Sequence, residues 1–376
     1  MAAAVEATID LRAIAHNVGV VRERSGADVM AVVKADGYGH GAVPVARTAL
    51  AAGAVEVGVA TIAEALALRQ GGIAAPVVAW LHTSQSDFAA AIRTGVEVVV
   101  SSPRQLAAVV AAARTVGRSA EVGVKVDTGL NRGGVAPDEW PTTVDLLARS
   151  TAERSVTLRT MMSHLAWADE PGHPGNDEQA RCLGDREQDL RRAGLRPQRV
   201  HLANSAAALT RRDLPGDLVR AGIAIYGRTP VPALGDFDLI PAMTLTAEIS
   251  LIKNVLAGQG ISYGHTWTAP RDTVVALLPC GYADGVPRLL SNLFEVWIDG
   301  RRYPNVGRVC MDQFAIELGP DGGGVTEGDR AVLFGAGAHG EPTALDWARL
   351  CGTIDYEILT GVRGRRVRRY LDVLAD

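Results

Sequence analysis

Short apolar runs alternate with longer amphipathic segments through the first 226 residues of the chain. The short runs are rich in β-branched residues and predict eight strands: Val29–Lys34, Glu56–Ala60, Pro76–Leu81, Val96–Val100, Glu121–Val126, Val156–His164, Arg199–Ala203 and Leu218–Tyr226. The segments between them predict seven helices: Ala42–Ala52, Ile62–Gln70, Asp87–Thr94, Pro103–Val116, Pro137–Arg149, Asp177–Ala193 and Ser205–Arg212. Such alternation is typical of parallel strands joined by right-handed crossovers.

The number of predicted strands favours a closed barrel. Eight parallel strands with intervening helices make a (β/α)₈ barrel, and the length of this part of the chain suits a compact one. An open, doubly wound sheet stays as the alternative, because the number of strands does not by itself separate the two.

The pattern changes at a segment rich in Pro and Gly, Pro230–Pro241, which reads as a linker. Beyond it, further strands are expected with few helices: Ala247–Val255, Thr273–Leu278, Glu295–Ile298, Phe314–Glu317 and Arg330–Phe334. Asp299-Gly300 predicts a hairpin turn, and Ala344–Cys351 a single helix. We therefore expect a barrel domain over residues 1–238 and a smaller, mainly β domain over residues 239–376, with residues 1–10 as a candidate partner for the second domain.

Composition narrows the class of protein. Of the 376 residues, 47% are hydrophobic and 21% charged, with a formal net charge of −4, so a nucleic-acid partner is not expected. The basic run Arg363–Arg369 is interpreted as a solvated strand. The chain shows neither a signal-peptide pattern nor an apolar run long enough for a membrane span, so we expect a cytoplasmic protein. Its four cysteines form no CxxC pair and no His cluster has metal-ligand spacing, so free thiols and no metal are expected.

Lys34 is the first residue that points to chemistry. It ends an apolar strand, and strand ends build the active-site face of such barrels. Apolar surroundings favour the neutral amine that Schiff-base chemistry requires. The glycines at 37, 39 and 41 would let a ligand approach the backbone closely.

Polar side chains also follow several later strands. They are Lys125, Asp127 and Arg132 after the fifth strand, His164 after the sixth, Asn204 and Ser205 after the seventh, and Arg220 in the eighth. In a barrel these residues converge on one mouth, which stability alone does not explain.

The last two strands are placed to bind a phosphate. Barrels often hold one with the loops after strands seven and eight, where Ser205 offers a hydroxyl and Gly222 and Ile223 offer backbone N–H groups. A lysine facing a phosphate site suggests pyridoxal phosphate as the cofactor.

The sequence closely resembles the alanine racemase family over nearly its whole length. The stretch AVVKADGYGHG at Ala31–Gly41 looks like that family's cofactor-attachment signature. Other matching stretches are KVDTGLNRGG, SHLAWAD, HLANSAA, RAGIAIYG, ISYGHTW, GYADG and VGRVCMDQ. The resemblance implies a (β/α)₈ barrel with a C-terminal β domain.

The resemblance also implies a reaction. L-alanine and D-alanine would be interconverted through an external aldimine with pyridoxal phosphate, supplying D-alanine for peptidoglycan. Lys34 would carry the cofactor and act as one base, and Tyr263 as the other. Arg220 would face the pyridine nitrogen, with His164 and Asn204 near the ring. A homodimer with shared active sites is expected.

The remaining roles follow from the same resemblance. The phosphate would be held by Tyr38, Ser205, Gly222, Ile223 and Tyr356. Arg132 would contact the phenolic oxygen of the cofactor, oriented by Lys125, which looks like the family's carbamylated lysine. Arg132 and the backbone N–H of Met311 would receive the substrate carboxylate. Tyr282 and Tyr356 would form a gate for the substrate, and Cys310 and Asp312 would lie around it.

Three other functions were weighed. A fold-related pyridoxal-phosphate decarboxylase would be expected to carry a carboxylate in place of Arg220. A broad-specificity racemase is usually exported, and the missing signal-peptide pattern argues against it. A non-catalytic pyridoxal-phosphate carrier would lack the C-terminal domain that holds Tyr263.

Overall fold

The computed structural model describes residues 4–214 and 216–371 and divides the chain into two compact units. The barrel unit comprises residues 14–37 and 42–239. The C-terminal unit comprises the chain from residue 240 onward together with residues 1–13 and 38–41.

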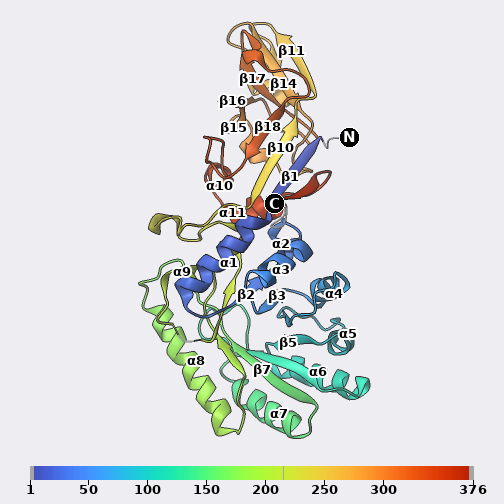
Figure 1. Ribbon diagram of the computed structural model, residues 1–376, viewed down its shortest axis with the longest axis vertical. Helices are drawn as coiled ribbons and strands as arrows, with labels where there is room; N and C mark the ends of the chain where they lie inside the picture. The colour runs from blue at the N-terminus through green and yellow to red at the C-terminus, as the bar shows by residue number, and fades with distance from the viewer. Residues whose placement is uncertain (1–3, 215, 372–376) are drawn as a thin grey trace. The chain divides into compact units, whose positions relative to one another are not determined.

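The barrel unit is built on an eight-stranded parallel sheet, which confirms the predicted (β/α)₈ architecture (Figure 1). Its strands are β2 (Asp28–Val32), β3 (Glu56–Val59), β4 (Val77–Ala79), β5 (Val96–Val100), β6 (Ala120–Lys125), β7 (Val156–Met162), β8 (Arg199–His201) and β9 (Leu218–Ala221). Strand β2 pairs with both β3 and β9, so Met30 lies between Glu56 and Arg220. Strands β8 and β9 are joined by the bond from the Arg220 N–H to the Ala203 carbonyl, at 2.9 Å.

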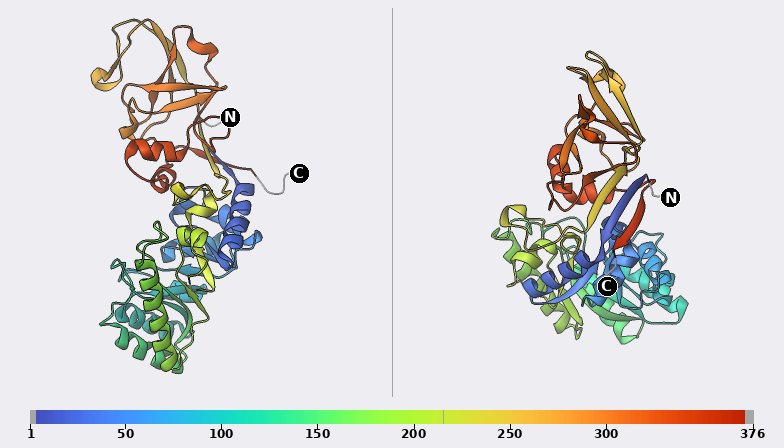
Figure 2. Two further views of the ribbon diagram at one scale, coloured as in Figure 1. Left: turned by 90° about the vertical axis from the view of Figure 1, so that its left-hand side faces the viewer. Right: turned by 45° about the horizontal axis from the view of Figure 1, so that its top comes forward.

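Helices surround the outside of this sheet (Figures 1 and 2). They are α3 (Ala42–Ala51), α4 (Ile62–Gln70), α5 (Phe88–Arg93), α6 (Pro103–Val116), α7 (Trp140–Ala152), α8 (Gly175–Arg192) and α9 (Ser205–Thr210). Local sequence fixes their ends: Ser102 caps α6, Pro103 occupies its first turn, and Gly117 ends it in the left-handed conformation. Two other helices, α1 (Leu11–Ser25) and the short α2 (Lys34–Tyr38), were not predicted.

The core of the barrel is apolar. Met30, Val78, Val99, Met162 and Leu218, from five different strands, are buried together inside it. Strands covered on both faces read as continuous apolar runs, which is why the sequence predicted them well.

The C-terminal unit is mainly β, as predicted. A nine-stranded sheet runs in the order β11-β14-β17-β16-β15-β18-β10-β1-β19, and β12 and β13 form a separate pair. The strands are β1 (Val5–Asp10), β10 (Met243–Glu248), β11 (Leu251–Val255), β12 (Gly260–Ile261), β13 (Trp267–Thr268), β14 (Thr273–Leu278), β15 (Glu295–Ile298), β16 (Arg301–Val306), β17 (Phe314–Gly319), β18 (Arg330–Phe334) and β19 (Val367–Leu371). Two helices complete it: α10 (Ala344–Cys351), with the predicted bounds, and α11 (Asp355–Gly361), which was not predicted.

Several local predictions for this unit are confirmed. Strands β15 and β16 form the hairpin predicted at Asp299-Gly300. The basic run near the C-terminus continues into strand β19, which pairs with β1 in parallel. β1 also pairs with β10 in the antiparallel sense.

Two predicted strands were wrong in extent. Ala247–Val255 is not one strand, because the N–H of Ile249 bonds Asp329 while that of Ser250 bonds Leu277, so the chain changes partner strands there. Leu218–Tyr226 ends as a strand at Ala221, and a 3₁₀ turn (η1, Ile223–Tyr226) follows. The Ser205 hydroxyl draws the N–H groups of Gly222 and Ala224 toward it, which bends the chain.

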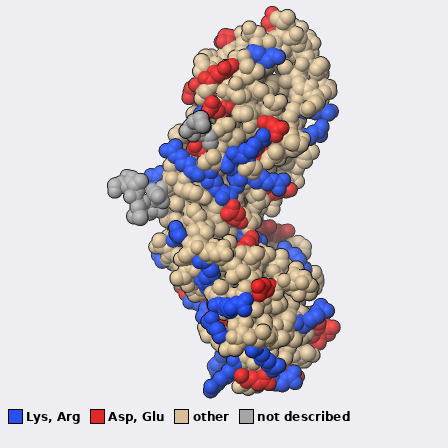
Figure 3. All heavy atoms as spheres, turned by 90° about the vertical axis from the view of Figure 1, so that its right-hand side faces the viewer, with Lys and Arg blue, Asp and Glu red and all other residues tan. Residues whose placement is uncertain are grey.

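Charged side chains of both signs lie on the surface of the molecule. Lys and Arg are interspersed with Asp and Glu on the face that Figure 3 shows. Within residues 4–214 and 216–371, no helix is both long and apolar enough to cross a membrane.

Candidate active site

Lys34 lies two residues beyond β2, at the carboxyl end of the barrel strands, and its side chain is half-buried. Burial lowers the pKa of its amine, and the positive charge of Arg132 lowers it further, while Glu64 opposes the shift. A lysine with a lowered pKa is neutral more of the time, which suits a nucleophile toward a carbonyl.

Arg220 is a buried cation held by many acceptors. Its Nη1 donates to the His201 carbonyl at 2.9 Å and lies 2.9 Å from Nδ1 of the same residue. Its Nη2 donates to the carbonyls of Ser163 at 2.7 Å and Leu202 at 2.9 Å, and lies 3.3 Å from Nδ1 of His164. In the described part of the chain no hydrogen bond uses its Nε, so one N–H remains for a ligand.

Two histidines beside Arg220 are held neutral. Burial, reinforced by the charge of Arg220, lowers the pKa of His164 to about 2 and that of His201 well below its usual value. The pKa of Arg220 itself falls only to about 10, so the guanidinium stays charged near pH 7 and must donate. Both histidines therefore accept at Nδ1 and carry their proton on Nε2.

Lys125 and Arg132 lie in and after β6. Burial, together with the charges of Arg132 and Arg220, lowers the pKa of Lys125 to about 8. The loop that carries Arg132 is shaped by Asp127, whose Oδ1 accepts the N–H groups of Gly129 at 3.0 Å and Asn131 at 3.1 Å. The side chain of Arg132 is exposed and so accessible to a ligand.

Ser205 forms a polar cradle with the start of η1. Its Oγ accepts the N–H groups of Gly222 at 2.9 Å and Ala224 at 3.3 Å, and the side chain is buried. With its acceptor sites used, the hydroxyl proton is left to donate. Asn204 caps α9 by accepting the N–H of Ala207 at 3.1 Å.

These residues fit pyridoxal phosphate. A lysine of lowered pKa can bind its aldehyde, the open Nε–H of Arg220 can meet the ring nitrogen, and the Ser205 hydroxyl can donate to the phosphate. Every one of these groups lies in the barrel unit, at or beyond the carboxyl end of a strand.

Tyr263 lies in the C-terminal unit, in a short 3₁₀ turn (η3, Tyr263–His265), with its side chain 72% exposed. The preceding Ser262 holds this turn, since its hydroxyl donates to the Arg308 carbonyl at 2.8 Å and lies 3.3 Å from Sγ of Cys310. The turn therefore presents the phenol to the surface beside Cys310.

The loops of Tyr282 and Met311 lie side by side in the same unit. The N–H of Tyr282 bonds the Cys310 carbonyl and that of Ala283 bonds the Met311 carbonyl, each at 3.1 Å. Arg365 joins the buried Asp284 at 2.7 Å to Asp312 at 2.9 Å. Tyr282, Cys310, Met311 and Asp312 therefore form one cluster.

Tyr38 and Tyr356 also come together in the C-terminal unit. Their ring centroids are 6.1 Å apart with the planes tilted by 49°. Burial raises the pKa of Tyr38, so its phenol stays protonated and can donate a hydrogen bond to an anion.

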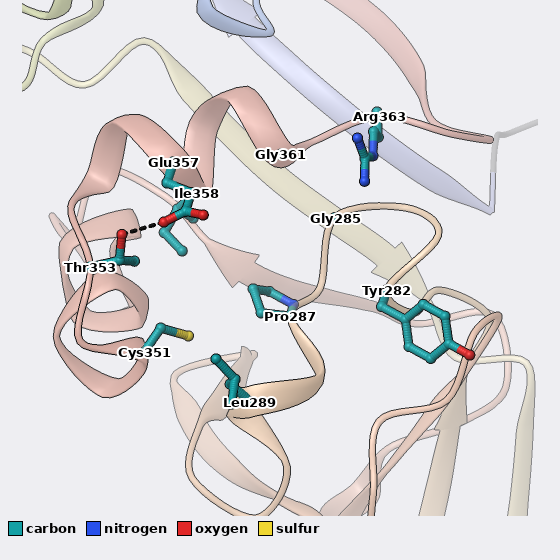
Figure 4. A pocket seen from close by; sticks show the side chains of 10 residues that line it. All are labelled: Tyr282, Gly285, Pro287, Leu289, Cys351, Thr353, Glu357, Ile358, Gly361 and Arg363. Atoms are coloured by element: carbon teal, nitrogen blue, oxygen red, sulfur yellow. Dashed lines mark hydrogen bonds between the residues drawn. The ribbon is translucent and has the colours of Figure 1, made fainter.

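A cavity of about 230 Å³ in the C-terminal unit touches the predicted gate but is not the reaction site. Its lining comprises Tyr282, Gly285, Pro287, Leu289, Cys351, Thr353, Glu357, Ile358, Gly361 and Arg363. Tyr282 lies on the side opposite Cys351 and Thr353, and Thr353 donates to Glu357 (Figure 4). Neither Tyr263 nor Met311 lines it.

Sequence reasoning missed the residues that hold Arg220. His201 and the Ser163 carbonyl each contact its guanidinium, yet neither was named as part of the site. A histidine within the predicted strand Arg199–Ala203 was the available signal for His201, because a buried imidazole needs a partner. A backbone carbonyl leaves no signal in the sequence.

Comparison with known proteins agrees with this arrangement. Residues 9–230 match the family "Alanine racemase, N-terminal domain", and residues 242–371 match "Alanine racemase, C-terminal domain". The chain is 58% identical to an alanine racemase of Mycolicibacterium vanbaalenii, over 97% of this chain and 94% of that protein. It is 57% identical to one of Mycobacterium tuberculosis, over 97% and 95%.

Solved structures give the same result. Alanine racemase from the D-cycloserine producer Streptomyces lavendulae superposes with a TM-score of 0.96 at 44% identity, covering 100% of this chain and 98% of that one. Alanine racemase from Bacillus anthracis with bound L-Ala-P superposes with a TM-score of 0.90 at 33% identity, covering 99% and 96%.

Proposed function

Because the chain belongs to the alanine racemase family, it interconverts L-alanine and D-alanine with pyridoxal phosphate, and we propose that Lys34 and Tyr263 are its two bases. D-alanine made in this way supplies peptidoglycan. The observation that carries the assignment is the barrel mouth, where Lys34 of lowered pKa accompanies a buried Arg220 whose two terminal nitrogens are hydrogen-bonded and whose Nε–H is left to donate.

Racemisation needs a base on each face of the substrate α-carbon. When bound, pyridoxal phosphate withdraws electrons from that carbon and acidifies its proton. A single side chain cannot easily reach both faces of a planar carbanion, so two bases are required. Lys34 holds the cofactor and serves one face, and the exposed phenol of Tyr263 serves the other.

Arg220 sets the electron demand at the pyridine nitrogen. Its terminal nitrogens are engaged by carbonyls and neutral histidines, which leaves Nε–H to donate. A guanidinium does not give up its proton near neutral pH, so Arg220 would offer the ring nitrogen of bound pyridoxal phosphate a hydrogen bond without protonating it. The cofactor would then be a weaker electron sink, which would limit transamination.

The other site residues bind and orient. Arg132, with Lys125 beside it, contacts the phenolic oxygen of the cofactor, and Arg132 with the Met311 N–H receives the substrate carboxylate. His164 and Asn204 lie near the ring. The phosphate is held by Tyr38, Ser205, Gly222, Ile223 and Tyr356. Tyr282 and Tyr356 gate the substrate, with Cys310 and Asp312 around them.

The decarboxylase alternative is disfavoured by the same geometry. That chemistry gains from a protonated ring, for which a carboxylate partner is expected where Arg220 stands. His164 and His201 are both neutral, so neither can donate a proton from Nδ1.

The test separates the two faces. Tyr263→Phe should slow exchange of the α-proton of L-alanine with deuterated solvent far more than that of D-alanine, if Tyr263 serves the L-enantiomer and Lys34 the D-enantiomer. Lys34→Ala should lose the visible absorbance of lysine-bound cofactor and nearly all racemisation measured by circular dichroism. Equal loss of both exchange reactions in Tyr263→Phe, or cofactor trapped by borohydride on another lysine, would contradict the assignment.

We further propose a homodimer with two shared sites, in which Lys34 works with the partner subunit's Tyr263. Support comes from the family and from the exposure of Tyr263 and Met311. When inactive Lys34→Ala and Tyr263→Phe proteins exchange subunits at random, about half the dimers are mixed, so roughly a quarter of all sites become native. Activity that stays absent, with exchange shown by mass spectrometry, would exclude the shared site.

The four cysteines suit the reducing cytoplasm, where we propose that the protein acts, since all four are free thiols.

A further inference from the structure

The chain adopts an unusual backbone directly after Lys34. Ala35, Asp36 and Gly37 have φ of 52°, 52° and 63°, and Tyr38 also has φ of 52°. Such a left-handed turn costs about 1–2 kcal/mol for each residue other than glycine. It persists only where surrounding contacts hold it, and here it sets the direction in which Lys34 leaves the strand.

Hydrogen bonds from within the turn and from a neighbouring helix hold it. The N–H of Gly37 donates to the Val33 carbonyl at 2.8 Å, and Oδ1 of Asp36 accepts the N–H of Ala42 at 3.0 Å. Another comes from α4, where Oε1 of Glu64 accepts the N–H of Ala35 at 2.8 Å. This last bond is made by the peptide immediately after Lys34.

The other oxygen of Glu64 is bound to the next strand. Its Oε2 accepts the N–H groups of Ala60 at 2.9 Å and Thr61 at 3.0 Å, just beyond the end of β3, and the Thr61 hydroxyl at 3.4 Å. One carboxylate therefore ties the carboxyl end of β2 to that of its sheet neighbour β3.

Helix capping explains the hydrogen bonds of only one of the two carboxylate oxygens of Glu64. Thr61 and Glu64 form a capping box at the start of α4, and Thr343 with Asp346 form another at the start of α10. In the second box, Oδ2 of Asp346 accepts from the Thr343 N–H and hydroxyl, and its Oδ1 lies 3.9 Å from Arg349 of the same helix. One oxygen thus suffices for the cap, and in Glu64 the second is used on the turn that follows Lys34.

We propose that Glu64 is a positioning residue for Lys34: it anchors the left-handed turn and aims the lysine amine into the barrel mouth. The inference rests on the proposed role of Lys34. The charge of Glu64 acts on the same amine, since it raises the pKa of Lys34 against burial and Arg132.

The experiment compares two variants of the same helix. Glu64→Ala removes the anchor and the charge. Thr61→Ala removes the cap that Thr61 offers to the Glu64 N–H at 3.2 Å and a 3.4 Å bond from its hydroxyl to Oε2, but leaves the carboxylate and its bond to the Ala35 N–H in place. Both should lower the stability of α4 by a similar amount, near the usual cost of a lost cap.

Two readouts use the protein without cofactor. Amide hydrogen exchange of the peptide that contains Ala35–Gly37 should speed up in Glu64→Ala and stay at the wild-type rate in Thr61→Ala. The pH dependence of reductive methylation of Lys34, followed by peptide mass spectrometry, should move to lower pH in Glu64→Ala and stay unchanged in Thr61→Ala, because the pKa of the amine falls without the carboxylate.

With cofactor bound, Glu64→Ala should lose about ten- to a hundredfold in kcat with little change in KM, since a small misplacement of a catalytic group costs that much. Glu64→Gln keeps one acceptor oxygen without the charge. It should show the same pH shift with a smaller loss of kcat, and it replaces the alanine variant if that protein does not fold.

Matching behaviour of the Glu64 variants and Thr61→Ala in exchange, pH profile and kcat would overturn the inference. This outcome differs from a failure of the role proposed for Lys34. In that case Lys34→Ala would keep lysine-bound cofactor and activity, whatever the Glu64 variants do.

Discussion

Glu97 offers a test of how the barrel tolerates a buried carboxyl group. It lies in β5 near the amino ends of the strands, away from Lys34, and is 2% exposed. Its Oε1 accepts a hydrogen bond from Thr160. Its Oε2 lies 3.8 Å from Nε of Arg159, and no hydrogen bond from the described residues reaches it.

Burial outweighs attraction at this position. Arg159 is shared with Glu56 at 3.4 Å and Glu121 at 4.0 Å, so one guanidinium faces three carboxylates. Burial therefore raises the pKa of Glu97 from 4.5 to about 8, helped by Glu56 and Glu121 and opposed by Thr160 and Arg159. This difference in the pKa of Glu97 corresponds to about 5 kcal/mol in the free energy of ionising the carboxyl group.

The sign of the pH effect follows from proton binding. Below pH 4.5 the carboxyl is protonated in both folded and unfolded chains. Between pH 4.5 and 8 the unfolded carboxyl ionises while the folded one keeps its proton, so the free energy of unfolding falls as pH rises. Glu97→Gln, which can still accept from Thr160, should match the wild type near pH 5 and exceed it by several kcal/mol near pH 8.5.

Urea unfolding of the protein without cofactor, followed by circular dichroism at each pH, measures the difference. Glu121→Gln controls for loss of a charge, because Glu121 belongs to the same cluster but its side chain is 45% exposed. A stability difference between Glu97→Gln and the wild type that is the same at pH 5 and 8.5 would refute the reasoning.

Two further predictions concern the site. Arg220→Glu should let the ring nitrogen be protonated and raise transamination relative to racemisation, measured by pyruvate formation; unchanged partitioning would contradict the role given to Arg220. Lys125, with a pKa of about 8, has about a tenth of its amine neutral at pH 7 and can add CO₂, so intact mass in bicarbonate should show a carbamate that Lys125→Arg lacks.

Sequence patterns predicted what depends on burial and local chemistry. Strands β5, β14, β15 and β18 begin and end where the apolar runs do, because covered strands need apolar side chains throughout or on alternate positions. Strand ends also identified Lys34, His164 and Arg220. What the sequence did not reveal depends on contacts between distant segments: β1 is defined by pairing with β10 and β19, and the end of β9 by the Ser205 hydroxyl.

The left-handed turn after Lys34 shows the same limit. The glycines at 37, 39 and 41 signalled an unusual backbone, and Gly37, Gly39 and Gly41 all have positive φ. Ala35 and Asp36 carry no such signal, since residues of these types avoid that conformation unless other groups compel it. Glu64, which supplies one of those contacts, is 29 residues from Ala35 and reads in the sequence as an ordinary helix cap.

The electrostatics of the barrel mouth explain why these residues belong together. Lys34, Lys125, Arg132 and Arg220 bring positive charge to one end of the barrel, and Arg132 lowers the pKa of both lysines. A shared positive field favours an anionic phosphate and a carboxylate substrate, and it makes each amine easier to hold neutral. Burial, together with the same field, keeps His164 unprotonated, so that it accepts from Arg220 rather than repelling it. Binding of the anions and readiness of the lysine for reaction thus both gain from the same cations.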